Sequence, residues 1–393
     1  MKHREPSRAW VMALAVLVGI NLRPIIASIG PLLELLQEDL KLSNAQGGLL
    51  TTLPVMMMGL FALGGPWLQR LVGEIKGVAM GITLIAVASA SRMLVDSAAA
   101  LIATAALGGI GIAIVQALMP VFLKRSCPDS AGMSMGLFTT GIMGGAAMAA
   151  AAAAPGADSI GWQATLAYAA VPALIALAVW LSLAGHSTSS AAPTRLPYRS
   201  ARAWLLLAFF GIGTGAYTLV LAWLAPFYVE LGWTATEAGY LLSALTVAEV
   251  GAGLLVSSLI HRCADRRMAT AVVIGLIIVG LGCLMAGPQA LAFLAMGCLG
   301  LGIGALFPLS LIITLDHARS PDEAGSLLAF VQGGGYLIAA SMPFLAGYLR
   351  DHLASLHWAW GLMIIGTLVL LVLNSQFRPS RTVHPPEALP MSS

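Results

Sequence analysis

The sequence has 393 residues, of which 59% are hydrophobic and only 9% charged, with a formal net charge of +3. A soluble domain carries roughly 25% charged residues, so these charges are too few to cover a water-soluble globule of this size. This composition argues against a soluble enzyme, and the small net charge gives no reason to expect a nucleic-acid partner. We therefore predict a protein whose main partner is the lipid bilayer.

Apolar segments of about 20 residues, bounded by charged or turn residues, are long enough to cross a bilayer as helices. The chain contains twelve of them, which predicts an all-α membrane protein with twelve transmembrane helices. The predicted spans are 10–33, 46–68, 77–95, 98–122, 132–154, 163–184, 203–229, 237–260, 269–287, 289–314, 325–348 and 357–376.

The first span contains Arg23, near the middle of an apolar stretch that runs from Trp10 to Leu36. The stretch is too long for a signal peptide and shows no small-residue cleavage site, so we interpret it as a retained span. Holding a guanidinium in hydrocarbon costs at least about 2.5 to 3.5 kcal/mol. We expect Arg23 to face a cavity inside a helical bundle. The alternative is a structural role, with the side chain reaching the interface or binding carbonyls freed by Pro24.

Orientation follows from the basic residues, because cytoplasmic loops hold the excess of lysine and arginine. Most of the 20 lysines and arginines fall on the side of the N-terminus. Only Lys41, Arg92 and Arg350 are assigned to the other side. This asymmetry predicts that both termini are cytoplasmic, in a bacterial inner membrane.

An internal repeat predicts two halves. The motif Gly109-Ile110-Gly111, with Pro128-Asp129-x-Ala131-Gly132 after it, recurs 193 residues later from Gly302 and from Pro321. Matches at a constant offset in corresponding loops indicate a duplicated six-helix bundle. The predicted division is a first half at 1–185, a cytoplasmic linker at 186–202 and a second half with a short tail at 203–393.

Two parallel six-helix halves resemble the major facilitator superfamily over essentially the whole chain. The resemblance implies a central cavity that opens to alternate sides of the membrane. The family's loop signature is degenerate in the first half, where Gln69 stands in place of the acid, whereas Asp265-Arg266-Arg267 keeps it in the second half. The Gly-Pro-x-x-Gly-Gly signature of many drug-proton exporters is missing from span five.

Four short strings are similar to the cyanate and 2-nitroimidazole transporter branch of that superfamily. They are Asn21-Leu22-Arg23-Pro24, Leu50-Thr51-Thr52-Leu53-Pro54, Gln116-Ala117-Leu118-Met119-Pro120 and Gly333-Gly334-Gly335-Tyr336-Leu337. The resemblance implies secondary active transport of a small solute. We expect a small anion such as cyanate, and a small heteroaromatic such as 2-nitroimidazole is the alternative.

Polar residues within the spans are the candidates for substrate binding, with Arg23 as the group that attracts an anion. Gln116 could add an amide donor, although an interhelical hydrogen bond explains it equally well. The candidate substrate-binding residues are Arg23, Asn21, Gln116, Tyr217, Gln332 and Tyr336. Thr52 and Thr139 are expected to bond back to their own helices.

Glu249 is the one acidic residue deep within a predicted span. A carboxyl there must be protonated, paired with a cation or in contact with cavity water. Three roles remain open: a salt-bridge partner of Arg23 in the empty site, a proton carrier for coupled transport, or a packing residue between the halves.

Other function classes lack the residues that they need. A membrane enzyme requires convergent catalytic groups within the spans, and a receptor usually carries a soluble signalling domain. The cysteines Cys127, Cys263, Cys283 and Cys298 stand singly, so neither a disulfide nor a metal site is predicted. We expect no cofactor, no enzymatic activity, a small-molecule substrate, protons as a candidate coupling ion, and a monomer.

Overall fold

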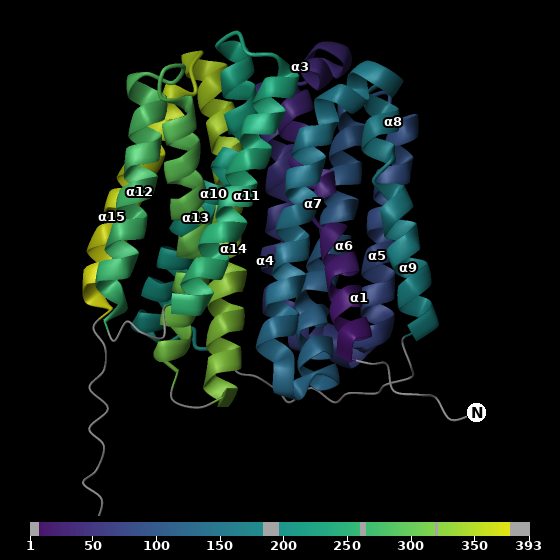
Figure 1. The fold of residues 1–393 in the computed structure, drawn as a ribbon, viewed down its shortest axis with the longest axis vertical. Helices are drawn as coiled ribbons and strands as arrows, with labels where there is room; N and C mark the ends of the chain where they lie inside the picture. The colour runs from purple at the N-terminus through teal and green to yellow at the C-terminus, as the bar shows by residue number, and fades with distance from the viewer. Residues whose placement is uncertain (1–7, 184–195, 260–264, 319–320, 378–393) are drawn as a thin grey trace, which may run out of the picture.

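The computed structural model describes residues 8–183, 196–259, 265–318 and 321–377, and these residues form helices and their connections without any β-strand (Figure 1). Twelve of the described helical segments are long and apolar enough to cross a membrane, as predicted. The first half contains α1 (Arg8–Ile20), α2 (Pro24–Ala27), α3 (Ile29–Leu40), α4 (Asn44–Val72), α5 (Glu74–Ser91), α6 (Ala98–Ser126), α7 (Ala131–Ile160), α8 (Trp162–Ala167) and α9 (Ala170–Leu183), with short 3-10 turns at Arg92–Leu94 and Pro128–Ser130. The second half contains α10 (Ala201–Glu230), α11 (Ala235–Leu259), α12 (Arg266–Ala286), α13 (Ala292–Asp316), α14 (Pro321–Leu353) and α15 (His357–Gln376).

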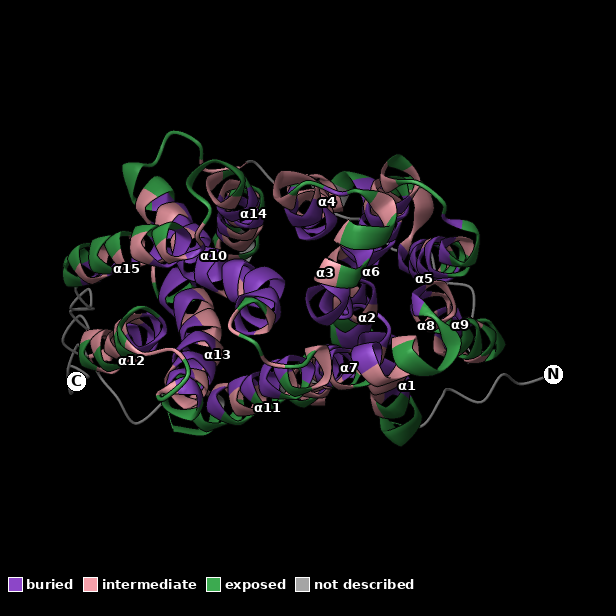
Figure 2. Cartoon of the chain, turned by 90° about the horizontal axis from the view of Figure 1, so that it is seen from above, coloured by how far each residue is buried: buried purple, intermediate pink, exposed green. Residues whose placement is uncertain are grey.

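Helices α1–α9 and α10–α15 gather in two bundles (Figure 2). The bundles meet where α4 packs on α14, α7 on α11, and α3 on α10. Gly59 allows the first of these contacts, since a Cβ added there would lie 2.8 Å from the carbonyl oxygen of Gly333. The linker predicted at 186–202 lies outside the described residues as far as residue 195.

Serine hydroxyls at the membrane boundary explain where several spans begin. Ser43 accepts a hydrogen bond from the backbone N–H of Gln46, and the Gln46 side chain accepts one from the backbone N–H of Ser43, so the two form a capping box. The hydroxyls of Ser97 and Ser200 each accept one hydrogen bond, from the backbone N–H groups of Ala100 and Ala203, and so cap α6 and α10. These contacts satisfy backbone donors that a helix end leaves unpaired.

The first span is longer than predicted and is interrupted twice. It extends over Arg8–Leu40, with breaks between Ile20 and Pro24 and at Ser28. Pro24 has no backbone N–H to donate to the carbonyl one turn back, so the regular helix ends at Ile20 and Pro24 begins the short helix α2. The break therefore places Arg23 at the start of the short helix α2.

Equivalent ion pairs of opposite polarity support the duplication. Glu74, the first residue of α5, pairs with Arg125 at the end of α6. In the second half Arg266, the first residue of α12, pairs with Asp316 at the end of α13. Both pairs join the third and fourth spans of their own half, at the end of the molecule where α1 begins.

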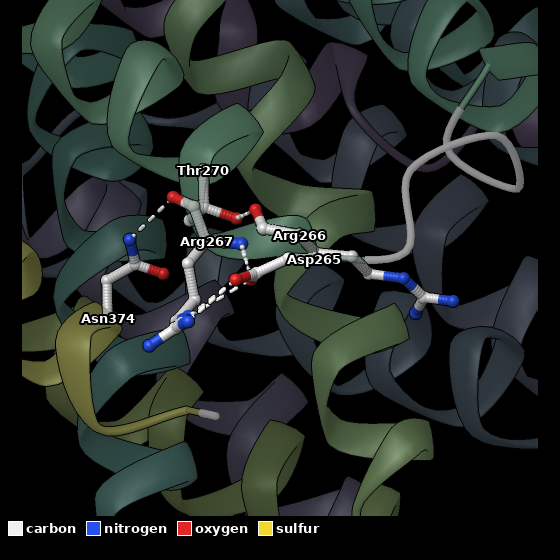
Figure 3. Close-up of polar contacts among 5 residues, drawn as sticks. All are labelled: Asp265, Arg266, Arg267, Thr270 and Asn374. Carbon is white, nitrogen blue, oxygen red and sulfur yellow. Dashed lines mark hydrogen bonds and ion pairs between the residues drawn. The ribbon is translucent and has the colours of Figure 1, made fainter. Parts of the chain in front are cut away.

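The loop signature Asp265-Arg266-Arg267 of the second half caps its own helix, α12 (Figure 3). The Asp265 carboxylate accepts hydrogen bonds from the backbone N–H of Arg267 at 3.0 Å and from its guanidinium, with Nη2 2.6 Å from Oδ2. These bonds hold the pKa of Asp265 down, at about 2. Asn374 Nδ2 donates to the Arg267 carbonyl at 2.9 Å, which ties α15 to α12.

The two halves are joined at the end of the molecule opposite the start of α1. There the Asp351 carboxylate of α14 accepts hydrogen bonds from the backbone N–H groups of Asn44 at 3.0 Å and Ala45 at 2.9 Å, and from Asn44 Nδ2 at 2.8 Å. A negative charge at a helix N-terminus also interacts favourably with the helix dipole. Asp351 thus caps α4 across the interface between the halves.

Arg350 and Thr52 add further contacts between the halves. Arg350 Nη2 lies 3.2 Å from a carboxylate oxygen of Glu230 and 3.8 Å from one of Glu34. The Thr52 hydroxyl donates to the Ala340 carbonyl at 2.7 Å, so the expectation that it bonds back to its own helix was wrong. Thr139 does bond back, to Met135, as predicted.

Two arginines assigned to the side of the membrane opposite the N-terminus instead lie inside the protein. The Arg350 side chain is only 14% exposed because it lies between α3, α10 and α14. Arg92 is 0% exposed and binds the interior of the first half. Both stand at the ends of spans, where a sequence alone does not separate an interfacial arginine from a buried one. Lys41 is exposed.

We expect Asp351→Asn to open this end of the molecule. An amide loses the charge and one acceptor, and charge-assisted hydrogen bonds contribute about 1.5 to 3 kcal/mol each. A cysteine at Ala340, in a variant without native cysteines, should then react at least about tenfold faster with a thiol reagent. Asp316→Asn, which breaks an ion pair within one half, is the control. Equal reaction rates in the two variants would show that Asp351 does not hold the halves together.

Candidate functional site

A cavity of about 610 Å³ lies between the two halves. The residues that line it lie in the parts of the helices nearest the end of the molecule where α1 begins. Examples are residues 58–69 of α4, 135–143 of α7 and 329–336 of α14. The contacts made by Asp351 and Arg350 lie at the opposite end of these helices. The cavity therefore extends from the middle of the protein toward the end of the molecule where α1 begins.

Arg23 lies at the break between α1 and α2 and lines this cavity. It is 4% exposed, and its guanidinium carbon is 5.4 Å from the centroid of the Tyr217 ring, a cation–π arrangement across the two halves. Its Nη1 lies 3.9 Å from the sulfur of Met58, and its Nε has no hydrogen-bond partner in the described structure. The guanidinium donates to no described backbone carbonyl, which leaves it able to bind an anion.

Glu249 lines the same cavity from α11 and is also 4% exposed. No ion pair joins it to Arg23 among the described residues, and neither carboxylate oxygen has a hydrogen-bond partner there. Gly304 of α13 packs directly against its backbone, because a Cβ at this position would collide with Glu249 Cα. The salt bridge considered for the empty site is therefore not formed in this conformation.

Four more of the predicted site residues line the cavity from α6, α10 and α14: Gln116, Tyr217, Gln332 and Tyr336. Gln116 Oε1 and the Tyr217 hydroxyl have no hydrogen-bond partner within the described chain. Gln332 and Tyr336 are four residues apart on one helix and so share a face, as the sequence predicted. Both halves thus present polar atoms to the same space.

Asn21 is the predicted site residue that does not line the cavity. It is buried, and its Nδ2 donates to the carbonyl of Leu17 at 2.7 Å, one turn back along α1. Asn21 directly follows the last residue of α1 and stays bonded to that helix, whereas Arg23 adjoins α2 and lines the cavity. We therefore do not include Asn21 in the proposed site.

Aromatic residues of the site escaped the sequence analysis. The Phe210 ring packs edge-on against Tyr336, with ring centroids 5.3 Å apart, and in a tilted arrangement against Phe307, with centroids 5.6 Å apart. All three line the cavity. A phenylalanine in an apolar span carries no signal that distinguishes a cavity wall from helix packing, so only the fold could reveal it.

Comparisons with known proteins agree with this architecture. Residues 10–331 match the model of the Major Facilitator Superfamily. The chain is 38% identical to the cyanate transport protein CynX of Escherichia coli (strain K12), covering 94% of this chain and 98% of that protein. It is 31% identical to the 2-nitroimidazole transporter of the same organism, covering 93% and 94% of the two chains.

A crystal structure of a D-xylose-proton symporter has the same fold. It superposes with a TM-score of 0.78 at 13% sequence identity, over 93% of this chain and 97% of that one. The two folds are therefore similar although the two sequences are not. With twelve membrane-crossing helices in two halves around one cavity, the chain belongs to the major facilitator superfamily.

Proposed function

We propose that this protein is a secondary active transporter that carries a small anion such as cyanate across a bacterial inner membrane. The observation that carries the proposal is Arg23, a buried guanidinium that faces a cavity between the two halves and whose Nε has no hydrogen-bond partner among the described residues. A charge held at this depth is costly unless it meets a partner, and a small anion is the natural one. The similarity to the cyanate transport protein supports that substrate.

The membrane orientation of the proposal follows the distribution of basic residues, with both termini in the cytoplasm. The cavity then faces the cytoplasm, and Asp351 and Arg350 close the opposite, periplasmic end. The halves predicted at 1–185 and 203–393 would rock against each other about the site. Opening the periplasmic end requires the Asp351 contacts with Asn44 and Ala45 to break.

Within the cavity we assign Arg23 to the charge of the anion and Gln116 and Tyr217 to hydrogen bonds with it. Tyr217 belongs to the second half and Arg23 to the first. An anion bound between them contacts both halves, so binding can be linked to their movement. We assign Glu249 to the coupling proton, because its carboxyl faces the same cavity and has no hydrogen-bond partner in the part of the chain that the structure describes.

The alternative substrate is a small heteroaromatic such as 2-nitroimidazole. The cavity wall formed by Phe210, Phe307 and Tyr336 favours it, since a flat ring can pack against these aromatic side chains. The similarity to the 2-nitroimidazole transporter agrees with this second candidate.

Uptake into proteoliposomes tests both candidates. Radiolabelled cyanate, bicarbonate, nitrate and a nitroimidazole are compared with and without a pH gradient. Saturable cyanate uptake that unlabelled nitroimidazole does not inhibit supports the anion site. Saturable uptake of the nitroimidazole alone supports the second candidate, and uptake of neither compound refutes both.

A further inference from the structure

A second buried arginine, Arg92, binds the interrupted part of the first span. It follows α5 in a 3-10 turn and is 0% exposed. Its Nη1 donates to the backbone carbonyl of Ile25 at 3.0 Å, and its Nε donates to the Thr104 hydroxyl at 3.2 Å. It does not line the cavity, so the proposed transport site gives it no role.

The Arg92 contacts fix a short piece of backbone next to Arg23. Ile25 lies two residues after Arg23, within the four-residue helix α2. So short a helix is not stable by itself, and its position depends on contacts with its neighbours. Arg92 directly follows α5, so its bond to Ile25 ties α2 to the end of that helix. The bond to Thr104 is a separate contact with α6, made by another nitrogen of the same guanidinium.

Close helix packing holds the other sides of the break. The side chain of Ile25 fills the space beside Gly108, where an added Cβ would collide with it. The carbonyl of Ile20, on the other side of Arg23, packs against Gly145. These contacts are apolar or steric, whereas Arg92 provides a directed, charge-assisted bond to the backbone.

We propose that Arg92 is a positioning residue, which acts through the Ile25 carbonyl to direct the Arg23 guanidinium into the cavity. The inference that this affects anion binding rests on the proposed function. The inference that Arg92 sets the direction of residue 23 does not. Two experiments separate these parts.

The first experiment measures the Kd for cyanate and the melting temperature of purified Arg92→Gln, Arg92→Lys and Thr104→Val. Arg92→Gln should raise the Kd about tenfold, because it removes a charge-assisted bond to the backbone. Arg92→Lys keeps a charged donor and should raise it about threefold. Thr104→Val is the matched control, since it removes the other bond of Arg92 but leaves the Ile25 contact, and its Kd should not change.

The second experiment needs no substrate. In a variant without native cysteines, Arg23→Cys is labelled with a small methanethiosulfonate reagent added from the cavity side. Combining it with Arg92→Gln should lower the labelling rate at least about threefold, because residue 23 is then no longer directed into the cavity. Combining it with Thr104→Val should leave the labelling rate unchanged. If Arg92→Gln does not fold, Arg92→Lys takes its place in both experiments with the same direction of change.

An unchanged Kd and an unchanged labelling rate in folded Arg92 variants would overturn the proposal. So would a loss of affinity that follows the melting temperature equally in Arg92→Gln and Thr104→Val, since that indicates general destabilisation. If unmodified protein does not bind cyanate but labelling still depends on Arg92, the positioning role stands and the proposed substrate fails.

Discussion

Arg23→Lys is expected to leave the protein folded in the membrane but to raise the KM for the transported anion about 10- to 100-fold. The estimate follows from the roughly 1.5 to 3 kcal/mol that a hydrogen bond to a charged group contributes, at about 1.4 kcal/mol for each factor of ten. The measurement is initial uptake into proteoliposomes as a function of anion concentration.

The geometry of the site explains why a lysine cannot replace this arginine. A guanidinium is a planar fork whose donors can grip an oxyanion or a cyanate ion from two directions. It also stacks on the Tyr217 ring, 5.4 Å from the ring centroid. An ammonium presents a compact point charge and loses both features.

Arg202→Lys is the matched control for this variant. Arg202 is an exposed arginine whose Nη1 donates to the Gln376 carbonyl at 2.9 Å, and it does not line the cavity. Its substitution should leave uptake unchanged. Unchanged uptake by Arg23→Lys as well would refute the anion site. If Arg23→Ala is not produced as folded protein while Arg23→Lys transports normally, the structural role considered for Arg23 is the better interpretation.

Most of the fold could be predicted from the sequence because the bilayer imposes a length on every span. Hydropathy found all twelve spans, and the predicted 357–376 coincides with α15. It misjudged the first span, which continues to Leu40 through Glu34, because charged residues normally mark the end of a span. Here Glu34 approaches Arg350 from the other half, a contact that only the folded structure reveals.

The candidate site could be predicted only where polar chemistry conflicts with the bilayer. Arg23, Gln116 and Glu249 stood out because polar groups in hydrocarbon need a reason to be there, and all three line the cavity. Phe210 did not stand out, because an aromatic residue suits lipid, helix packing and a cavity equally. Arg92 was assigned to the far side of the membrane because it lies near the end of the predicted span 77–95, although it is buried against the break beside Arg23.

Glu249→Gln is expected to abolish accumulation of substrate against its gradient while preserving exchange. Glutamine keeps the shape and hydrogen bonding of the side chain but cannot take up or release a proton. With substrate on both sides of a proteoliposome, labelled and unlabelled molecules should still exchange near the unmodified rate. With a pH gradient and substrate outside only, the internal concentration should stop rising at the external value.

Glu237→Gln is the matched control on the same helix. Glu237 is exposed in the first turn of α11, where its carboxylate accepts hydrogen bonds from the backbone N–H and the hydroxyl of Thr234 at 2.9 and 2.8 Å. It lies outside the cavity lining, so its substitution should leave both exchange and accumulation unchanged. Any loss common to both variants would then reflect α11 itself rather than proton coupling.

The affinity of Glu249→Gln distinguishes the roles that remain for this carboxyl. Neither oxygen has a hydrogen-bond partner among the described residues, so an ionised Glu249 would be held in a low-dielectric cavity at considerable cost. If its charge competes with the substrate for Arg23 in another conformation, the variant should bind the anion more tightly, because that competitor is gone. If it carries the proton, affinity measured at a pH where the carboxyl is protonated should match that of the unmodified protein. Unmodified accumulation, pH dependence and affinity would together leave Glu249 as a packing residue beside Gly304 and refute both mechanistic roles.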